Sequence, residues 1–263
     1  MSSEKPRSRK HEPGSDKPKG KRAEMRAQRR RQQRVRRLTT LIVVVLAAFG
    51  VVGFLIAPTI RDAITPVGDF VQITPTSRPM ADGTAMGDPN APVTIETFAD
   101  FQCIACAIFA EDTEARVADT LVATSQVRYV FRHYPFLDQG IPGSNESQQS
   151  ANASMCAAEQ GRFWDYHDML YANFQGANQG NFSNRRLAAF AESLGLDMEQ
   201  FNTCFRENRY RDQIEQDRAT AQSYAVSGTP SVFVNGQRVG QPQRVPTFEE
   251  IQQAVEAALP ASQ

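Results

Sequence analysis

Two cysteines three positions apart, Cys103 and Cys106, constrain this chain more than any other feature of its sequence. Residues 93–98 (VTIETF) are mostly β-branched or aromatic and predict a strand, and a helix-length run follows the cysteines to about residue 124. Residues 127–131 (VRYVF) predict a second strand. Two thiols on the first turn of a helix can form a disulfide with little backbone movement. A C-x-x-C pair between a strand and a helix is therefore interpreted as a redox-active pair.

The charge of the chain is divided unequally along its length. Residues 1–37 hold 15 of the 29 Lys and Arg residues against four acidic residues, a net charge of +11, whereas the remainder carries −11. This stretch has too few apolar residues to fold alone, so we predict a basic, disordered tail. Nucleic-acid binding is one explanation of the charge. Because a membrane span follows immediately, we favour a cytoplasmic tail that sets topology, and we expect no nucleic-acid partner.

The stretch after the tail, residues 38–58, is long and apolar enough to cross a membrane. About 20 residues at about 1.5 Å each span the roughly 30 Å hydrocarbon layer. The basic block before this stretch places the N-terminus in the cytoplasm and the following domain outside it. A cleaved signal peptide is disfavoured by the length of the run and by Leu55 and Pro58, and the flanks of Arg36-Arg37 match a twin-arginine signal poorly. We therefore predict an uncleaved, single-pass anchor.

The remainder divides into a linker at 59–82 and a domain at 83–263. The linker is rich in proline and glycine, and we expect it to leave the orientation of the domain free. Within the domain, helical patterns fill a region at about 144–226, where Ser183 is the expected N-cap of one helix and Asp197 with Gln200 of another. A strand at 231–234, the turn Asn235-Gly236 and a short return predict a hairpin. Thr247 with Glu250 predicts the cap of a last helix.

This order of elements predicts an α/β, thioredoxin-like fold. A βαβ half comes first, a helical insertion follows, and a hairpin and a helix complete the second half, all preceded by one transmembrane helix. The domain resembles the DsbA-like thioredoxin-fold family in several stretches. They are GDPNAPV at 87–93, FADFQC at 98–103 with Cys106, Phe163-Trp164 with His167-Asp168, and Gly228-Thr229-Pro230 followed by FVNG at 233–236.

The resemblance covers about residues 84–260, and the membrane-anchored bacterial members of the family fit the topology predicted above. It implies thiol–disulfide oxidoreductase activity on exported proteins without a cofactor, and it implies that Pro230 is in cis and faces the cysteines. Thr229 is then expected to offer its backbone to an extended substrate segment. The chain departs from the family at Ile104-Ala105, where many relatives have Pro followed by His or Tyr. It also has Thr97 where relatives often carry an acidic residue, and Glu96 should point to the other face of the strand.

Different roles are expected for the two cysteines of the motif. Cys103 is the expected nucleophile, because the free N–H groups and the dipole of a helix N-terminus stabilise a thiolate. Cys106, one turn further and more buried, is the expected resolving thiol. A zinc site is disfavoured because a second C-x-x-C or a nearby His pair is missing, and an inert structural disulfide is the other alternative. Since Ile104 and Ala105 supply no side-chain donor or charge, we predict a weaker oxidant than a motif with His.

The other two cysteines, Cys156 and Cys204, lie on separate predicted helices. Because Cys103 and Cys106 pair easily, we predict a structural disulfide between Cys156 and Cys204, with two buried free thiols as the alternative. His133 and His167 are interpreted as packing or surface residues rather than acid–base groups.

The sequence therefore predicts an extracytoplasmic, membrane-anchored thiol–disulfide oxidoreductase that forms or exchanges disulfides in exported proteins. A membrane redox partner is expected to recycle its cysteine pair. Reduction or isomerisation is the alternative direction of the same chemistry. A non-catalytic thioredoxin-fold module that binds partners through the Pro230 face is the alternative from another class.

Overall fold

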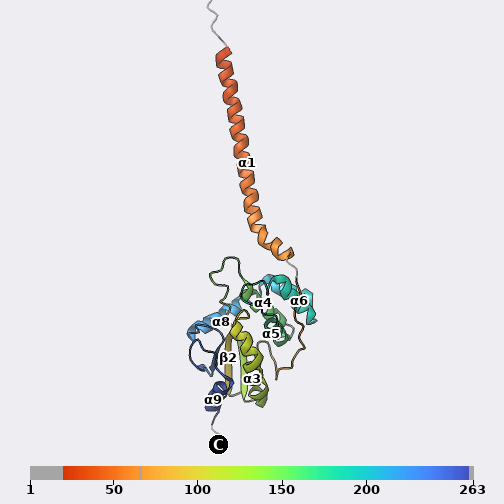
Figure 1. Ribbon diagram of the computed structural model, residues 1–263, viewed down its shortest axis with the longest axis vertical. Helices are drawn as coiled ribbons and strands as arrows, with labels where there is room; N and C mark the ends of the chain where they lie inside the picture. Colours follow the sequence, from red (N-terminus) through yellow and green to blue (C-terminus); the bar gives the residue numbers. More distant parts are fainter. Residues whose placement is uncertain (1–19, 65–66, 261–263) are drawn as a thin grey trace, which may run out of the picture. The chain divides into compact units, whose positions relative to one another are not determined.

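The computed structural model describes residues 20–64 and 67–260, which divide into two compact units with a boundary after Arg61. Helix α1 (Gly20–Ile64), 45 residues long, accounts for the described part of the first unit and ends three residues beyond the boundary (Figure 1). Within α1, Glu24–Leu55 is long and apolar enough to cross a membrane, and it is the one such helix in the described ranges.

The predicted disordered tail is wrong for residues 20–37, which are helical, while residues 1–19 lie outside the described part of the chain. The stretch 20–37 is rich in Arg, Ala and Gln, which have high helix propensity. Residues that extend an existing apolar helix also avoid the cost of nucleating a new one. The basic stretch therefore continues the predicted membrane helix as one element.

Five strands of the second unit form one sheet in the order β1-β3-β2-β4-β5 (Figure 1 labels β2). The strands are β1 (Ala85–Met86), β2 (Val93–Ala99), β3 (Val127–His133), β4 (Ser231–Val234) and β5 (Gln237–Arg238). β2 and β3 are parallel, and the other neighbours are antiparallel. The two strands predicted on either side of the C-x-x-C segment therefore lie side by side at the centre of the sheet. β1 was missed because two residues carry no pattern.

A helical crossover joins the parallel strands β2 and β3, as this type of pairing requires. It consists of α2 (Ile104–Phe109), a π-helical turn η1 (Ala110–Glu114), α3 (Ala115–Thr120) and a 3₁₀ turn η2 (Val122–Thr124). The predicted helix after the cysteines is thus present but contains a π-turn in its middle. Glu114, at the end of that turn, is 1% exposed and lies in the core.

The predicted helical insertion contains five helices among the described residues. They are α4 (Glu146–Ala158), α5 (Phe163–Ala172), α6 (Asn184–Ser193), α7 (Met198–Glu207) and α8 (Arg211–Ser223). Asp197 caps α7 by accepting hydrogen bonds from the N–H groups of Glu199 and Gln200. Ser183 precedes α6, but its buried hydroxyl has no hydrogen-bond partner in the structure, so it caps by position alone.

The C-terminal half forms as its local signals predict. Asn235 and Gly236 both have positive φ, 44° and 77°, as a two-residue hairpin turn between β4 and β5 requires. Helix α9 (Phe248–Ala258) begins with a complete capping box of Thr247 and Glu250.

Residues 67–82 lie against the domain, which corrects the prediction of a free linker up to residue 82. Phe70 and Ile73 pack against the hydrophobic core. The N–H of Val71 donates to Oδ1 of Asn173 at 2.7 Å, and Nδ2 of Asn173 donates to the Val71 carbonyl at 2.9 Å. A side-chain amide has the same kinds of donor and acceptor as a peptide group, so Asn173 binds the backbone of Val71 as a neighbouring strand would. We call residues 67–82 the N-terminal strap.

Candidate active site

The structure brings together the two cysteines of the motif and the Thr229–Pro230 peptide. Cys103 is the N-cap of α2, and its thiol donates to the Thr229 carbonyl with a Sγ–O distance of 3.3 Å. The Thr229–Pro230 bond is cis. Both cysteines are free thiols, Cys103 partly exposed and Cys106 buried at 1% exposure. The Cys103 thiol is therefore accessible to a partner, whereas the Cys106 thiol is shielded from solvent.

The surroundings shift the pKa values of the two thiols in opposite directions. The pKa of Cys103 falls to about 6, chiefly through a hydrogen bond from the Cys106 thiol. The side chain of Thr229 and the N–H groups of Cys106 and Ala105 also lower this pKa, and burial opposes the shift. Burial raises the pKa of Cys106 well above its ordinary value, and the neighbouring Cys103 adds to this effect. Near neutral pH this arrangement stabilises a thiolate at the exposed position and a neutral thiol at the buried one.

Two buried polar residues fix the loop that carries Cys103. The carboxylate of Asp100, 2% exposed, accepts hydrogen bonds from the Ser147 hydroxyl and from the N–H groups of Gln102, Phe136 and Leu137. The Gln102 amide donates to Ser147 at 2.8 Å and to Asp138 at 2.9 Å. Asp100 and Gln102 belong to the stretch that carries the family resemblance, but no structural role was predicted for either residue. An acid and an amide between apolar residues at a strand end were the signal that could have marked them as structural.

A second polar cluster lies in the core beside the crossover helix. Oε2 of Glu114 accepts a hydrogen bond from the Tyr129 hydroxyl at 2.6 Å, and Oε1 lies 3.5 Å from Nε2 of His167. Nδ1 of His167 lies 2.8 Å from Asp168. Burial raises the pKa of Glu114, and the charge of His167 opposes this rise. His167 thus joins a buried polar cluster, which its interpretation as a packing residue did not include.

Thr97, which stands where relatives often carry an acidic residue, and its neighbour Glu96 have different surroundings. Thr97 is buried, at 1% exposure. Glu96 makes an ion pair at 2.8 Å with Arg132 and accepts a hydrogen bond from Tyr224, whose ring packs in a separate small apolar cluster. His133 is fully buried, and burial lowers its pKa to about 3, so it is neutral at physiological pH.

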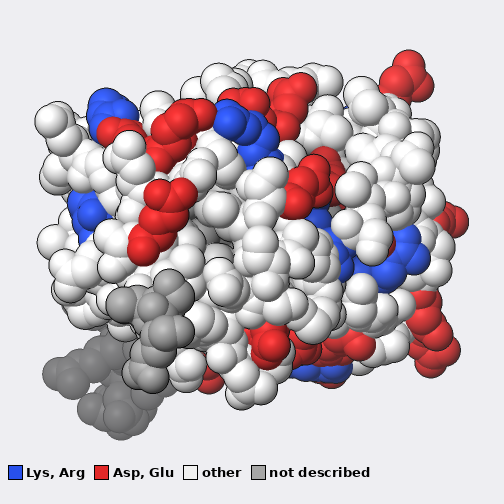
Figure 2. Space-filling view, turned by 90° about the horizontal axis from the view of Figure 1, so that it is seen from below, with Lys and Arg blue, Asp and Glu red and all other residues white. Residues whose placement is uncertain are grey.

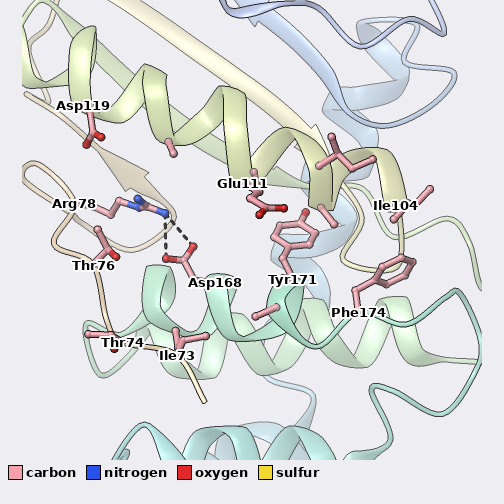
Figure 3. A pocket seen from close by; sticks show the side chains of 15 residues that line it. Ile73, Thr74, Thr76, Arg78, Ile104, Glu111, Asp119, Asp168, Tyr171 and Phe174 are labelled. Carbon is pink, nitrogen blue, oxygen red and sulfur yellow. Dashed lines mark hydrogen bonds and ion pairs between the residues drawn. The ribbon is translucent and has the colours of Figure 1, made fainter. Parts of the chain in front are cut away.

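A cleft of about 640 Å³ is lined by Ile104, the residue that follows Cys103 (Figure 3). One wall is the face of α2, η1 and α3 that begins at Ile104, next to Cys103. The opposite wall is formed by the N-terminal strap around Ile73 and Arg78 and by α5 with the residues after it, including Phe174. Arg78 is bound to both carboxylate oxygens of Asp168, at 3.0 and 3.1 Å.

Figure 2 shows one face of the domain, on which basic and acidic side chains are interspersed among broad uncharged areas. Among the described residues, no group of three or more His, Cys, Asp or Glu side chains is arranged to hold a metal ion.

Comparisons with known proteins assign the domain to a family. The oxidised crystal structure of BdbD from Bacillus subtilis superposes with a TM-score of 0.59 at 22% identity, over 73% of this chain and 98% of that one. The probable disulfide bond formation protein D of Bacillus anthracis is 23% identical over 177 residues, 66% of this chain and 77% of that protein. A family model described as thioredoxin matches residues 80–257, well over half of the chain. The chain belongs to the DsbA-like thioredoxin-fold family. This confirms the family and the fold class predicted from the sequence.

The DsbA-like domain also resembles one part of a longer relative. The Na(+)/H(+) antiporter NhaA 3 of Salinispora tropica is 39% identical over 152 residues. These residues are 58% of this chain but 21% of that protein, so the chain spans about a fifth of the length of this relative.

Proposed function

We propose that this DsbA-like chain is a membrane-anchored thiol–disulfide oxidoreductase that acts on exported proteins. The observation that carries the proposal is the pair of opposite thiol environments beside the Thr229–Pro230 peptide. A partly exposed Cys103 with a pKa of about 6 is suited to attack or be attacked, and a buried Cys106 with a raised pKa is suited to resolve.

The oxidising exchange uses the two cysteines and two substrate thiols. In the oxidised pair, a substrate thiolate attacks Sγ of Cys103, the Cys103–Cys106 bond breaks, and Cys106 leaves as a thiolate that takes up a proton. A second substrate thiolate then attacks the substrate sulfur of the mixed disulfide and releases Cys103 as a thiolate. The substrate loses two electrons and the cysteine pair gains them. A membrane redox partner must accept these electrons to restore the disulfide.

Thr229 and Pro230 have a binding role in this proposal. The Thr229 carbonyl already lies within hydrogen-bond distance of the Cys103 thiol, so a substrate strand that pairs with the Thr229 backbone would bring its own cysteine to Sγ.

The pKa of Cys103 also bears on the direction of exchange. At about 6 it lies between the values of about 7 for thioredoxin and about 3.5 for DsbA. This supports an oxidant weaker than DsbA and keeps reduction or isomerisation as the second candidate. The measured reduction potential against glutathione decides between them: a value at or above that of DsbA would contradict the weaker oxidant.

The location outside the cytoplasm is supported by the charge of the chain. The basic stretch before the apolar part of α1 favours a cytoplasmic N-terminus, which puts the C-terminal domain on the other side of the membrane.

The test is a trapping experiment with Cys106→Ser in the full-length chain. This variant should accumulate mixed disulfides between Cys103 and exported proteins, visible on non-reducing gels and identified by mass spectrometry. Cys103→Ser should give none. A binding module would yield no covalent adduct with either variant, and that result would overturn the proposal.

A further inference from the structure

The crossover helix presents one continuous stripe to the cleft, and the stripe starts at the nucleophile. Ile104, Ile108, Glu111 and Asp119 recur at intervals close to one or two helical turns and line the same wall. Figure 3 shows Ile104 near one end of this wall and Asp119 toward the other, with Glu111 between them. The cleft therefore leads away from Cys103 along a wall that changes from aliphatic to acidic.

At the aliphatic end of the cleft, two isoleucine residues are exposed to solvent. The side chains of Ile104 and Ile108 are 59% and 62% exposed, although most large apolar residues of the domain are buried. Phe174 lies across from Ile104 in Figure 3, so apolar surface is present on both sides of the cleft beside the nucleophile. Exposed apolar surface of this kind marks a binding site when it is contiguous and bordered by polar groups.

The other end carries uncompensated negative charge. Four charged residues line the cleft, and two of them, Arg78 and Asp168, neutralise each other through two hydrogen bonds. Glu111 and Asp119 are exposed and have no ion-pair partner within the described part of the chain. Arg116, on the same helix, points elsewhere and binds Glu249 at 3.0 Å. The cleft therefore has a net charge of about −2 beyond its aliphatic end.

We infer that this cleft binds the substrate segment that flanks the reacting cysteine, and that it selects an aliphatic residue beside that cysteine and basic residues further along. The inference rests on the proposed function, because it takes the occupant to be an extended polypeptide attached to Cys103 during exchange.

The spacing of Glu111 and Asp119 along the cleft predicts where basic residues should lie in the substrate segment. Glu111 lies seven residues and Asp119 fifteen residues after Ile104, which at about 1.5 Å per helical residue is about 10 Å and about 22 Å. An extended peptide advances about 3.3 Å per residue. Basic side chains should therefore be preferred about three and about seven positions from the substrate cysteine, on one side of it only, since the cleft leaves the nucleophile in one direction.

The test follows a single covalent step in the full-length Cys106→Ser chain in detergent micelles. Its substrates are peptides whose one cysteine is joined to thionitrobenzoate by a disulfide. The Cys103 thiolate attacks the peptide sulfur, the mixed disulfide forms, and the thionitrobenzoate anion that leaves is measured by absorbance. A Lys is placed at each position on either side of the cysteine in turn, and matched peptides carry Glu instead.

At low salt, Lys three or seven positions away on one side should react about five- to tenfold faster than Glu there, and the ratio should approach one at high salt. Lys directly beside the cysteine should give no gain over Leu, because Ile104 and Phe174 face that position. In Glu111→Gln/Asp119→Asn, the preference for Lys should disappear. In the control Asp112→Asn/Asp212→Asn, which loses the same charge from exposed positions outside the cleft, it should persist.

Two results would overturn the inference while leaving the proposed function intact. One is equal rates for Lys and Glu peptides when an uncharged small disulfide still reacts with Cys103. The other is an equal loss of preference in the control variant, which would assign the effect to the overall charge of the domain. Absence of reaction with the small disulfide would overturn the proposed function, and the inference with it.

Discussion

Nε2 of His167 lies 3.5 Å from Oε1 of Glu114 in the interior of the domain, and neither atom has another hydrogen-bond partner. The two side chains are 0% and 2% exposed. Buried polar atoms without a full hydrogen bond cost free energy, so this pair lowers the stability of the folded domain. The free energy that this pair costs depends on whether Glu114 is protonated. Burial is the main cause that raises the pKa of Glu114.

The first prediction is that Glu114→Gln flattens the dependence of stability on pH. An unfolded Glu ionises near about pH 4.3, whereas Glu114 in the folded chain holds its proton to higher pH. Stability from this group is therefore fully present below about pH 4.3 and is lost as the pH rises through the raised folded pKa. Gln keeps an acceptor for Tyr129 but cannot ionise. Urea midpoints of the oxidised protein between pH 4.5 and 7.5 should fall less in Glu114→Gln than in the wild type.

A matched control for this prediction is Glu192→Gln, which removes an exposed carboxylate from α6. It should follow the wild type across the whole pH range. Parallel curves for Glu114→Gln and the wild type would show that Glu114 ionises no differently in the folded and unfolded chains.

The second prediction concerns the thiolate of Cys103. In the reduced protein, alkylation by iodoacetamide should follow a titration with a midpoint near the pKa of about 6, and Cys106 should stay unmodified. A depressed pKa stabilises the reduced folded state above the ordinary thiol pKa of about 8.5, and this stabilisation is lost as the pH falls through about 6. The protein should therefore become a weaker oxidant below pH 6, relative to a reference thiol pair. A midpoint near 8.5 would remove the physical basis of the assigned roles.

The third prediction is that Ala105→His makes the protein more oxidising. The existing hydrogen bonds to Cys103 come from the Cys106 thiol, Thr229 and backbone N–H groups, and Ala105 contributes no side-chain donor. An imidazole next to the thiolate should lower the pKa of Cys103 by about one unit, which is about 1.4 kcal/mol and raises the potential by about 30 mV. Redox titration against glutathione measures the shift. Ala105→Leu, of similar bulk but without a donor, should leave the potential near that of the wild type.

The features that the sequence predicted correctly depend on neighbours in the chain. The turn at Asn235-Gly236 and the capping box of Thr247 and Glu250 need only backbone geometry within four residues, so their residue types identify them. The C-x-x-C pair is local in the same sense.

The features that could not be predicted from the sequence depend on contacts between residues far apart in the chain. Val71 binds Asn173 across 102 positions, and this contact turns an expected linker into part of the domain. Glu114 enters the core from the crossover helix and accepts a hydrogen bond from Tyr129, 15 positions further along the chain. A pattern of propensities carries no information on either contact, because both are decided by the packing of elements that are distant in sequence.

The fourth prediction concerns the disulfide that the structure has between Cys156 and Cys204, with a Cα–Cα distance of 5.8 Å. The bridge joins α4 and α7 across 48 positions of the chain. Its removal in Cys156→Ala/Cys204→Ala should lower the free energy of unfolding by about 2–4 kcal/mol, measured by urea denaturation. Exchange with a small disulfide should persist under native conditions. Mass mapping that finds both thiols alkylatable in the non-reduced wild type would contradict the bridge.

The last prediction is that Asn173→Ala releases the N-terminal strap. Asn173 is 2% exposed and makes one hydrogen bond to the N–H and one to the carbonyl of Val71, and its amide also donates to the Met169 carbonyl. Truncation leaves these backbone groups without partners and should lower the free energy of unfolding by about 1–3 kcal/mol. Amide hydrogen exchange should accelerate at Val71, whereas the exposed Gln175→Ala should change neither quantity. Unchanged exchange at Val71 in Asn173→Ala would mean that the packing of Phe70 and Ile73 alone holds the strap on the domain.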